Sequence, residues 1–270
     1  MFSILLQEER PGPLRRLFGG PRVELRTFKK LRFAVVSLPS VRRADFHKLR
    51  KILGRTGGNL VVQRGIQLPP GCGLALLDTS PYARSVLQTT LDSMLRRAKI
   101  PLRELNTLLF DPSGRELECA KVLVKYSGRL KIVTGAQALY EDFSHRMLEE
   151  YGAVVSVEDT LENPSHCRLV VAPGGLGEQA PLAGDTPVLS VEDCGAQRGY
   201  FGFRVPLPGA YRELIPAGVD EFDFQAALYS LCHVLALGKI PAAACLRCGQ
   251  EIPVERMAAD ILEKTADFNL

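Results

Sequence analysis

Short apolar runs alternate with helix-like stretches between residues 105 and 193 of this chain. Runs such as LNTLLF, RLKIVTG and RLVVAPGG are separated by stretches with the length and polarity of helices, among them ALYEDFSHRMLEEYG. This alternation is typical of a parallel sheet whose strands are joined by crossover helices. We therefore predict an α/β fold with a doubly wound, mainly parallel sheet over these residues.

The chain divides into two predicted lobes. Residues 1–100 form a small α/β lobe with strands at VELRTF, RFAVVSLP and NLVVQRGI, a helix at ADFHKLRKILG, and a linker helix at SPYARSVLQTTLDSMLRRA. Residues 101–270 form the lobe with the parallel sheet, and its C-terminal helices return to the first lobe. An apolar helix stops at Gly238, and a final amphipathic helix buries Met257, Ile261 and Leu262.

Composition places the protein in the cytoplasm. No apolar run approaches the roughly 18 residues that a membrane span requires. The seven cysteines are an odd number and are dispersed through strand and helix patterns, which indicates reduced thiols in a cytosol.

Charge is distributed unevenly along the chain. Residues 1–55 hold 14 Lys and Arg against four acids, a balance of +10, so that −6 falls on the remainder of a chain whose net charge is +4. A basic N-terminal lobe could attract an anionic partner, although the same charges could simply form the solvated face of a helix. The segment lacks the aromatic interleaving and fold signatures of nucleic-acid modules, which argues against a nucleic acid as that partner.

The loops that follow the parallel strands are the predicted ligand site. Ligands of such sheets bind beyond the carboxyl ends of the strands, where DPSG, TGAQ and APGGLG should converge in a polar, glycine-lined pocket between the lobes. The last loop packs three glycines into four residues and is the best single candidate, with a tight turn that binds nothing as the alternative. The predicted ligand-binding residues are Ser113, Gly114, Thr134, Gly135, Gly174, Gly175, Gly177 and Gln225.

Taken in order, these units resemble the nicotinamide-dinucleotide domain of shikimate dehydrogenases and glutamyl-tRNA reductases. NTLLF, RLKIVTG and RLVVAPGG correspond to its first, second and fourth strands, and FDFQAALYSLCHVLALGKIP is similar to the Gln-Ala-Ala helix of shikimate dehydrogenases, which contains Gln225 here. The resemblance covers about half of the chain. It implies a Rossmann-like fold and an NAD(P)-dependent oxidoreductase.

The chain departs from that family at the cofactor loop. The family's G-x-G-x-x-G is replaced by DPSGRE, in which Pro112 removes an amide donor while Asp111 and Glu116 add negative charge where a pyrophosphate would lie. Ser113 and Glu116 also fit a capping box, a purely structural helix start. No acid stands at residues 134–137 to bind a ribose hydroxyl. We therefore predict that neither NAD nor NADP binds in the standard pose.

No complete catalytic or metal-binding set is present in the sequence. Cys245 and Cys248 form one C-x-x-C pair, which supplies only two of the four ligands of a structural zinc and is best interpreted as two unreactive thiols. The four histidines are isolated, so none pairs locally as a triad member would. Two hypotheses remain: a non-catalytic small-ligand-binding or regulatory protein, and an NAD(P)-dependent oxidoreductase with an atypical cofactor loop.

Overall fold

A computed structural model describes residues 1–101, 104–161, 167–176 and 186–266. The chain forms two compact units. Unit 1 contains Met1–Tyr82 and Leu207–Leu237, and unit 2 contains Ala83–Pro206 and Gly238–Leu270. The chain therefore passes from one unit to the other near the start of α3 (Ser80–Ala98), whereas the sequence suggested a boundary near residue 100.

Unit 1 is a four-stranded sheet with the order β2-β3-β1-β4. Strands β3, β1 and β4 are parallel, and β2 pairs antiparallel with β3 at one edge. Its helices and strands are β1 (Phe2–Gln7), α1 (Pro13–Phe18), β2 (Arg22–Phe28), β3 (Leu31–Leu38), α2 (Phe46–Leu53), β4 (Leu60–Val62), α6 (Gly209–Arg212) and α7 (Glu221–Cys232), with short 3-10 turns at Val41–Arg43 and Gly54–Gly58.

Alternation along β1 divides the core of unit 1 between two helices. Leu5 packs with Leu49 and Leu53 of α2 on one face of the sheet. On the other face Phe2 stacks on Phe33 at 5.2 Å between ring centroids, and both rings meet Phe224 of α7 edge-on. The helix that returns late in the sequence thus completes the N-terminal core, in line with the period-2 pattern of a strand buried on both faces.

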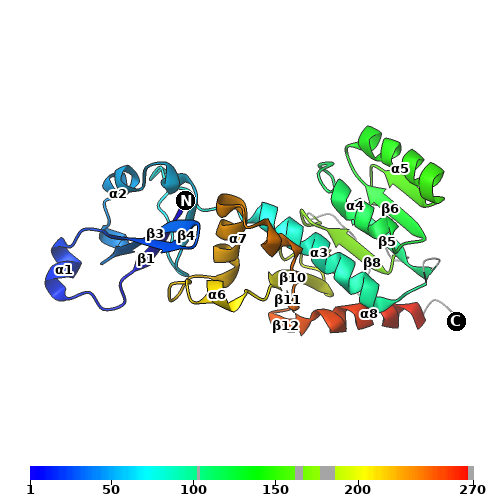
Figure 1. The fold of residues 1–270 in the computed structure, drawn as a ribbon. Coiled ribbons are helices and arrows are strands. Elements are labelled where there is room, and N and C mark those ends of the chain that lie inside the picture. Colours follow the sequence, from blue (N-terminus) through cyan, green and yellow to red (C-terminus); the bar gives the residue numbers. More distant parts are fainter. Residues whose placement is uncertain (102–103, 162–166, 177–185, 267–270) are drawn as a thin grey trace. The chain divides into compact units, whose positions relative to one another are not determined.

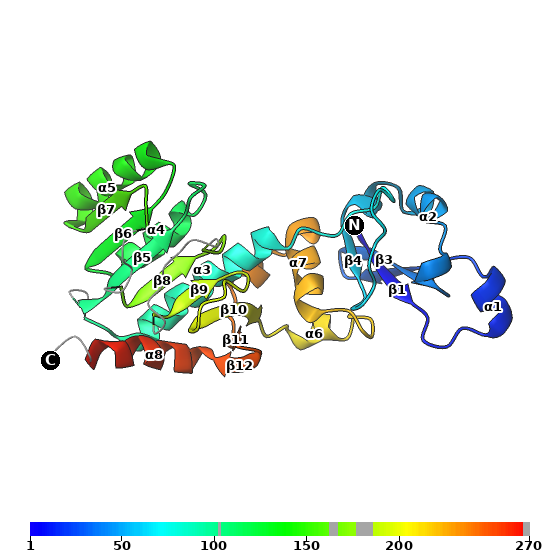
Figure 2. The ribbon, with the colours of Figure 1, turned by 180° about the vertical axis from the view of Figure 1, so that it is seen from behind.

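Unit 2 is an eight-stranded mixed sheet, drawn in green to orange in Figures 1 and 2. Besides most of α3, its elements are β5 (Asn106–Phe110), α4 (Leu117–Val124), β6 (Arg129–Val133), α5 (Gln137–Tyr151), β7 (Val154–Glu158), β8 (Leu169–Ala172), β9 (Val188–Ser190), β10 (Gly199–Arg204), β11 (Ala244–Arg247), β12 (Gln250–Pro253) and α8 (Val254–Ala266), with a 3-10 turn at Leu235–Lys239 before β11.

The strand order of unit 2 is that of a Rossmann-like domain. The sequence β7-β6-β5-β8-β9-β10 is parallel throughout, and counted from β5 it reads 3-2-1-4-5-6, with β11 and β12 added antiparallel beyond β10. Successive strands are added on one side of β5 as far as β7 and on its other side from β8 onward. The point between β5 and β8 is therefore the topological switch point, where such sheets bind ligands. The predicted two-lobed α/β fold is confirmed.

Several elements differ from the expectation. Strand β1 and the β11–β12 hairpin were not predicted. The apolar helix α7 ends at Cys232 rather than at Gly238, because His233 adopts a left-handed conformation (φ +55°) that closes it. In α8, Met257 and Ile261 are buried as expected, but Leu262 is 41% exposed. No helix in the described part of the chain is both long and apolar enough to cross a membrane.

Candidate functional site

The carboxyl ends of β5, β6 and β8 bring the three predicted loops to one edge of unit 2. Leu109 is in register with Ile132 of β6 and with Val171 of β8, so the residues that follow these three strands leave the sheet at the same level. The loops 111–114, 134–137 and 173–176 therefore share an edge at the switch point, as parallel pairing requires. Gly177, also predicted here, lies outside the described residues.

The first two loops pack directly on each other. The amide of Gly135 donates to the carbonyl of Pro112 at 3.3 Å. Gly114 has φ +70°, and a Cβ added to it would stand 2.4 Å from the Cβ of Ala136. Glycine at this position is thus required by the close approach of the neighbouring loop, so the space beside it is occupied by protein atoms.

A buried carboxylate fills the start of α4. Asp111 is 2% exposed, and its Oδ2 accepts hydrogen bonds from the amide of Glu116 at 2.8 Å and from the hydroxyl of Tyr140 at 2.6 Å. Its Oδ1 accepts from the hydroxyl of Ser113 at 3.2 Å. Backbone N–H groups at a helix start are the donors that bind phosphates in Rossmann-like domains. Here the chain's own carboxylate takes one of them.

The capping box predicted for Ser113 and Glu116 is wrong. Helix α4 begins at Leu117, Glu116 is its N-cap residue, and no side chain of that residue makes a capping hydrogen bond. The Ser113 hydroxyl is instead directed to Asp111, because a charged acceptor is the stronger partner.

A second acid is buried beside the first. Glu116 is 3% exposed and pairs with the guanidinium of Arg84 on α3, with 3.0 Å between Nε and Oε1. Burial raises the pKa of Glu116, the charge of Arg84 opposes this, and the charge of Asp111 adds to it. Burial, together with the adjacent Asp111 carboxylate, also raises the pKa of Tyr140, which keeps its proton and can act as a donor.

Of the remaining residues at this edge, Thr134 is buried in the turn after β6, whereas Gly174 in the loop after β8 is exposed. Thr134 is buried, and its hydroxyl oxygen accepts the amide of Ala136 at 3.0 Å, so it shapes the turn after β6. Gly174 is exposed with open space around it, and Gly175 has φ +82° with its amide bonded to the carbonyl of Ala172. The β8 loop therefore presents backbone that no neighbouring side chain covers among the described residues.

Gln225 belongs to unit 1. It is 1% exposed on α7; its Oε1 accepts from the hydroxyl of Tyr82 at 2.6 Å, and its Nε2 donates to Glu221 at 3.3 Å. These bonds lie within unit 1, where they join the start of α3 to α7.

Two hollows are lined by described residues that do not belong to the three loops. One, of about 720 Å³, is at the amino edge of unit 2, where the ends of α4 and α5 precede β6 and β7, and Lys125, Met147 and Tyr151 contribute to its wall. The other, of about 260 Å³, is in unit 1 next to α1 and α2.

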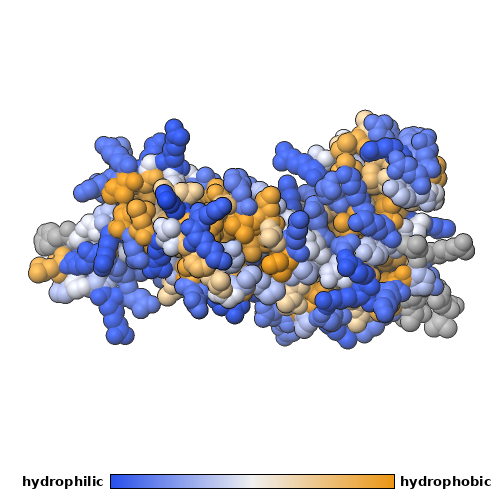
Figure 3. Space-filling view, in the orientation of Figure 1, coloured by the Kyte–Doolittle hydropathy of each residue, from blue (hydrophilic) through white to orange (hydrophobic). Residues whose placement is uncertain are grey.

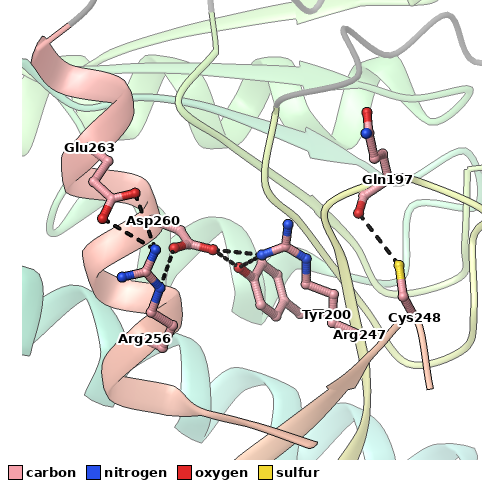
Figure 4. Close-up of polar contacts among 7 residues, drawn as sticks. All are labelled: Gln197, Tyr200, Arg247, Cys248, Arg256, Asp260 and Glu263. Carbon is pink, nitrogen blue, oxygen red and sulfur yellow. Dashed lines mark hydrogen bonds and ion pairs between the residues drawn. The ribbon is translucent and has the colours of Figure 1, made fainter. Parts of the chain in front are cut away.

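A buried polar cluster that the sequence did not reveal joins α8 to the β10–β11 pair (Figure 4). Asp260 is 2% exposed; it accepts a hydrogen bond from the hydroxyl of Tyr200, and ion pairs reach it from Arg247 at 2.9 Å and Arg256 at 3.0 Å. The only sequence signal was an acid three residues after Met257 on the apolar stripe of the helix. Both oxygens of the buried Asp260 carboxylate have partners, which indicates a structural role.

The C-x-x-C pair lies in the β11–β12 hairpin. Burial raises the pKa of the Cys245 thiol to about 12, so it is protonated at neutral pH. Cys248 is exposed in the turn with φ +48°. Within the described residues, no group of three His, Cys, Asp or Glu side chains could hold a metal ion.

No protein-family model matches the chain, and no curated protein matches it. Among solved structures, the chain is similar to quinate dehydrogenase from Corynebacterium glutamicum in complex with NAD, with 11% identity over 97% of this chain and 99% of that one at a TM-score of 0.33. A shikimate dehydrogenase in complex with NADP+ is 12% identical over 98% and 96% of the two chains, with a TM-score of 0.31. L-tryptophan dehydrogenase from Nostoc punctiforme is 9% identical over 88% and 75%, with a TM-score of 0.30. The resemblance to these dehydrogenases is distant, and the fold assignment stands on the strand order.

Proposed function

We propose that the protein is a non-catalytic small-ligand-binding or regulatory protein whose Rossmann-like unit no longer binds a dinucleotide. The observation that carries this proposal is the buried Asp111 carboxylate at the start of α4. In dinucleotide-binding domains this position is left to the pyrophosphate, which receives the backbone amides. The chain supplies a side-chain carboxyl group in its place.

Electrostatics and space both support a closed cofactor position. A pyrophosphate placed at the start of α4 would meet Asp111 and Glu116, and at an effective dielectric of about 20 two like charges 4 Å apart repel by about 4 kcal/mol. The contact of Gly114 with Ala136 leaves no room for a phosphate between the two loops. A cofactor would have to displace the hydrogen bonds that Asp111 makes.

A smaller ligand could still bind at the outer rim of the same edge. Ser113, Gly135 and Gly174 are exposed there, and the Gly174–Gly175 backbone has open space beside it. We propose these residues as the ligand contacts, with Gly114 and Thr134 as the residues that hold the loops. The basic N-terminal segment is proposed to take an anionic partner, and the free thiols, including the exposed Cys248, support residence in a reducing cytoplasm.

Titration calorimetry and thermal unfolding with NAD and NADP test this proposal. A dinucleotide with a Kd of about 10 µM, added at about 1 mM, would stabilise the fold by about 2.7 kcal/mol. For a unit of this size that corresponds to a rise in Tm of roughly 5–10 °C. We expect neither saturable heat nor such a rise with either cofactor.

The alternative is an NAD(P)-dependent oxidoreductase with an atypical loop, which the strand order favours. Micromolar binding that is lost in Gly114→Val and kept in Gly58→Ala would establish it in place of our proposal. Gly58 serves as the control because it lies in unit 1 with open space around it. Absorbance of the reduced cofactor at 340 nm would then report turnover.

A further inference from the structure

A hollow of about 260 Å³ in unit 1 gathers positive charge. It lies where β3 ends and α2 begins, and the end of α1 closes its side. Leu38 and Leu49 form its floor and are buried, whereas the side chains of Arg16, Arg43 and Lys48 are exposed at its rim. Three cationic residues from three different segments of the chain thus line one small space.

These three cations are unpaired. Within the described part of the chain, none of their side chains takes part in an ion pair or hydrogen bond, whereas the adjacent Arg15 is held by Glu8. One acid, Asp45, also lines the hollow, and it accepts the amide of Lys48 at 3.0 Å as the N-cap of α2. The rim therefore has a net charge of +2, because Asp45 balances only one of the three cations.

The turn at the end of α1 determines where Arg16 lies. Helix α1 ends when the amide of Gly19 donates to the carbonyl of Arg15, and a Cβ on Gly19 would stand 2.3 Å from that oxygen. Figure 3 shows the long hydrophilic side chains that project from this unit, with apolar residues exposed at α1, where Leu14 is 74% exposed. Gly19 is thus required for the turn that brings α1 beside the start of α2.

The volume of the hollow limits the ligand. Pockets for drug-sized molecules occupy about 300–1,000 Å³. A space of about 260 Å³ with a net charge of +2 fits one phosphate group and a short substituent. A phosphomonoester carries a charge of about −1.5 to −2 at pH 7, which matches the charge of the rim.

We propose that this hollow binds a small phosphomonoester, or inorganic phosphate, through Arg16, Arg43 and Lys48. Arginine provides paired N–H donors for the phosphate oxygens, and lysine adds a point charge. Ser40, which also lines the space, offers a hydroxyl. The inference rests on the proposed anionic partner and gives it a site and a chemical class; it does not depend on the cofactor position in unit 2.

Two double variants with equal charge loss test the site. R43A/K48A removes two rim cations, whereas R42A/K51A removes two exposed cations of the same segments that do not line the hollow. Glycerol 3-phosphate and inorganic phosphate are titrated into each protein by calorimetry at fixed ionic strength, with glycerol as the uncharged control. Circular dichroism checks that each variant is folded, and Arg16→Ala provides an independent removal should R43A/K48A unfold.

We expect saturable binding of glycerol 3-phosphate to the unaltered protein and to R42A/K51A, with a Kd at least tenfold higher in R43A/K48A. Binding should tighten between pH 5.5 and 7.5, since the second pKa of the monoester is about 6. Equal weakening by both double variants, or no saturable binding, would overturn the proposal. A six-nucleotide RNA tests the other class of anionic partner. If the RNA binds tightly, both double variants weaken that binding equally and glycerol 3-phosphate shows no saturable binding, the proposal is overturned and the basic segment binds anions diffusely.

Discussion

Removing the Asp111 carboxylate should both destabilise unit 2 and make it sensitive to anions. The carboxylate accepts hydrogen bonds from Glu116, Tyr140 and Ser113 while almost fully buried. In Asp111→Ala the amide of Glu116 and the hydroxyl of Tyr140 lose their acceptor. Asp111→Asn keeps an acceptor oxygen and removes only the charge, so it serves as the matched variant.

The magnitude follows from those bonds. A buried donor left without a partner costs about 1–3 kcal/mol, and two such donors set an upper range of roughly 2–6 kcal/mol. Water entering the space and relief of repulsion with Glu116 recover part of this. We expect Asp111→Ala to lower the free energy of unfolding by about 2–4 kcal/mol and Asp111→Asn to lower it by about 1 kcal/mol.

Cys119 offers a local assay for the same region. Its thiol is fully buried and lies 3.9 Å from Glu116, so alkylation of Cys119, followed by peptide mass spectrometry, reports opening of the start of α4. Labelling should accelerate in Asp111→Ala, and formate or phosphate should slow it again by occupying the vacated helix start. Unchanged labelling and stability, or equal protection of the unaltered protein by these anions, would refute the assignment of Asp111 as a built-in anion.

The remaining predictions concern three other positions. Gly114→Ala should lower Tm, because its left-handed backbone and the facing loop leave no room for a Cβ, at a cost of about 1–3 kcal/mol, whereas Gly174→Ala should leave Tm unchanged. Asp260→Ala should cost about 1–3 kcal/mol in urea unfolding, because the buried Tyr200 hydroxyl and the partly exposed Arg247 guanidinium lose their acceptor, against less than about 0.5 kcal/mol for the exposed Glu263→Ala. Because the pKa of Glu116 is raised, the folded protein holds the proton of this carboxyl more tightly than the unfolded chain does. The protein therefore loses free energy of unfolding as the pH rises from about 4.3, the pKa of an unperturbed Glu, through the raised pKa. Glu116→Gln should remove this loss, and its stability relative to the unaltered protein should therefore increase between pH 4 and 7; a constant difference across that range would contradict it.

The central parallel strands of unit 2 were predictable because they are buried on both faces. LVVA in β8 is a continuous apolar run, and NTLLF in β5 ends in one. Such runs need no tertiary information to be recognised as buried strands. Strand β1 was missed since its core partners, Phe33 and Phe224, lie far along the sequence. Its burial depends on a helix that arrives some 220 residues later.

The β11–β12 hairpin was obscured by a competing motif. Cys248 and Gly249 both have positive φ, as the two central residues of a tight hairpin turn require. The glycine of the Cys248-Gly249 pair is typical of a hairpin turn, but the C-x-x-C spacing of Cys245 and Cys248 is also typical of metal and redox sites. Alternation in QEIP is also too short to predict a strand by itself.

The candidate site was predictable in place and not in detail. Parallel pairing alone predicts that the loops after β5, β6 and β8 share an edge, and they do. The contacts that define the chemistry there come from α3 and α5, through Arg84 and Tyr140, and no local pattern announces them. The spacing of Ser113 and Glu116 fits a capping box in the sequence alone. In the structure the Ser113 hydroxyl donates to Asp111 instead, a contact that the spacing does not predict.

The two units therefore treat an anion in opposite ways at the start of a helix. In unit 2 the chain places Asp111 and Glu116 at α4, so an incoming phosphate meets like charge and occupied donors. In unit 1 the start of α2 is capped by Asp45 but is surrounded by three unpaired cations. Because the exposed rim cations attract a phosphate ester weakly while Asp111 and Glu116 repel it, we expect the ester to bind unit 1 more tightly than unit 2. Asp111→Ala should reduce this difference in affinity between the units, because it opens a second, weaker anion site in unit 2. R43A/K48A should leave that second site intact.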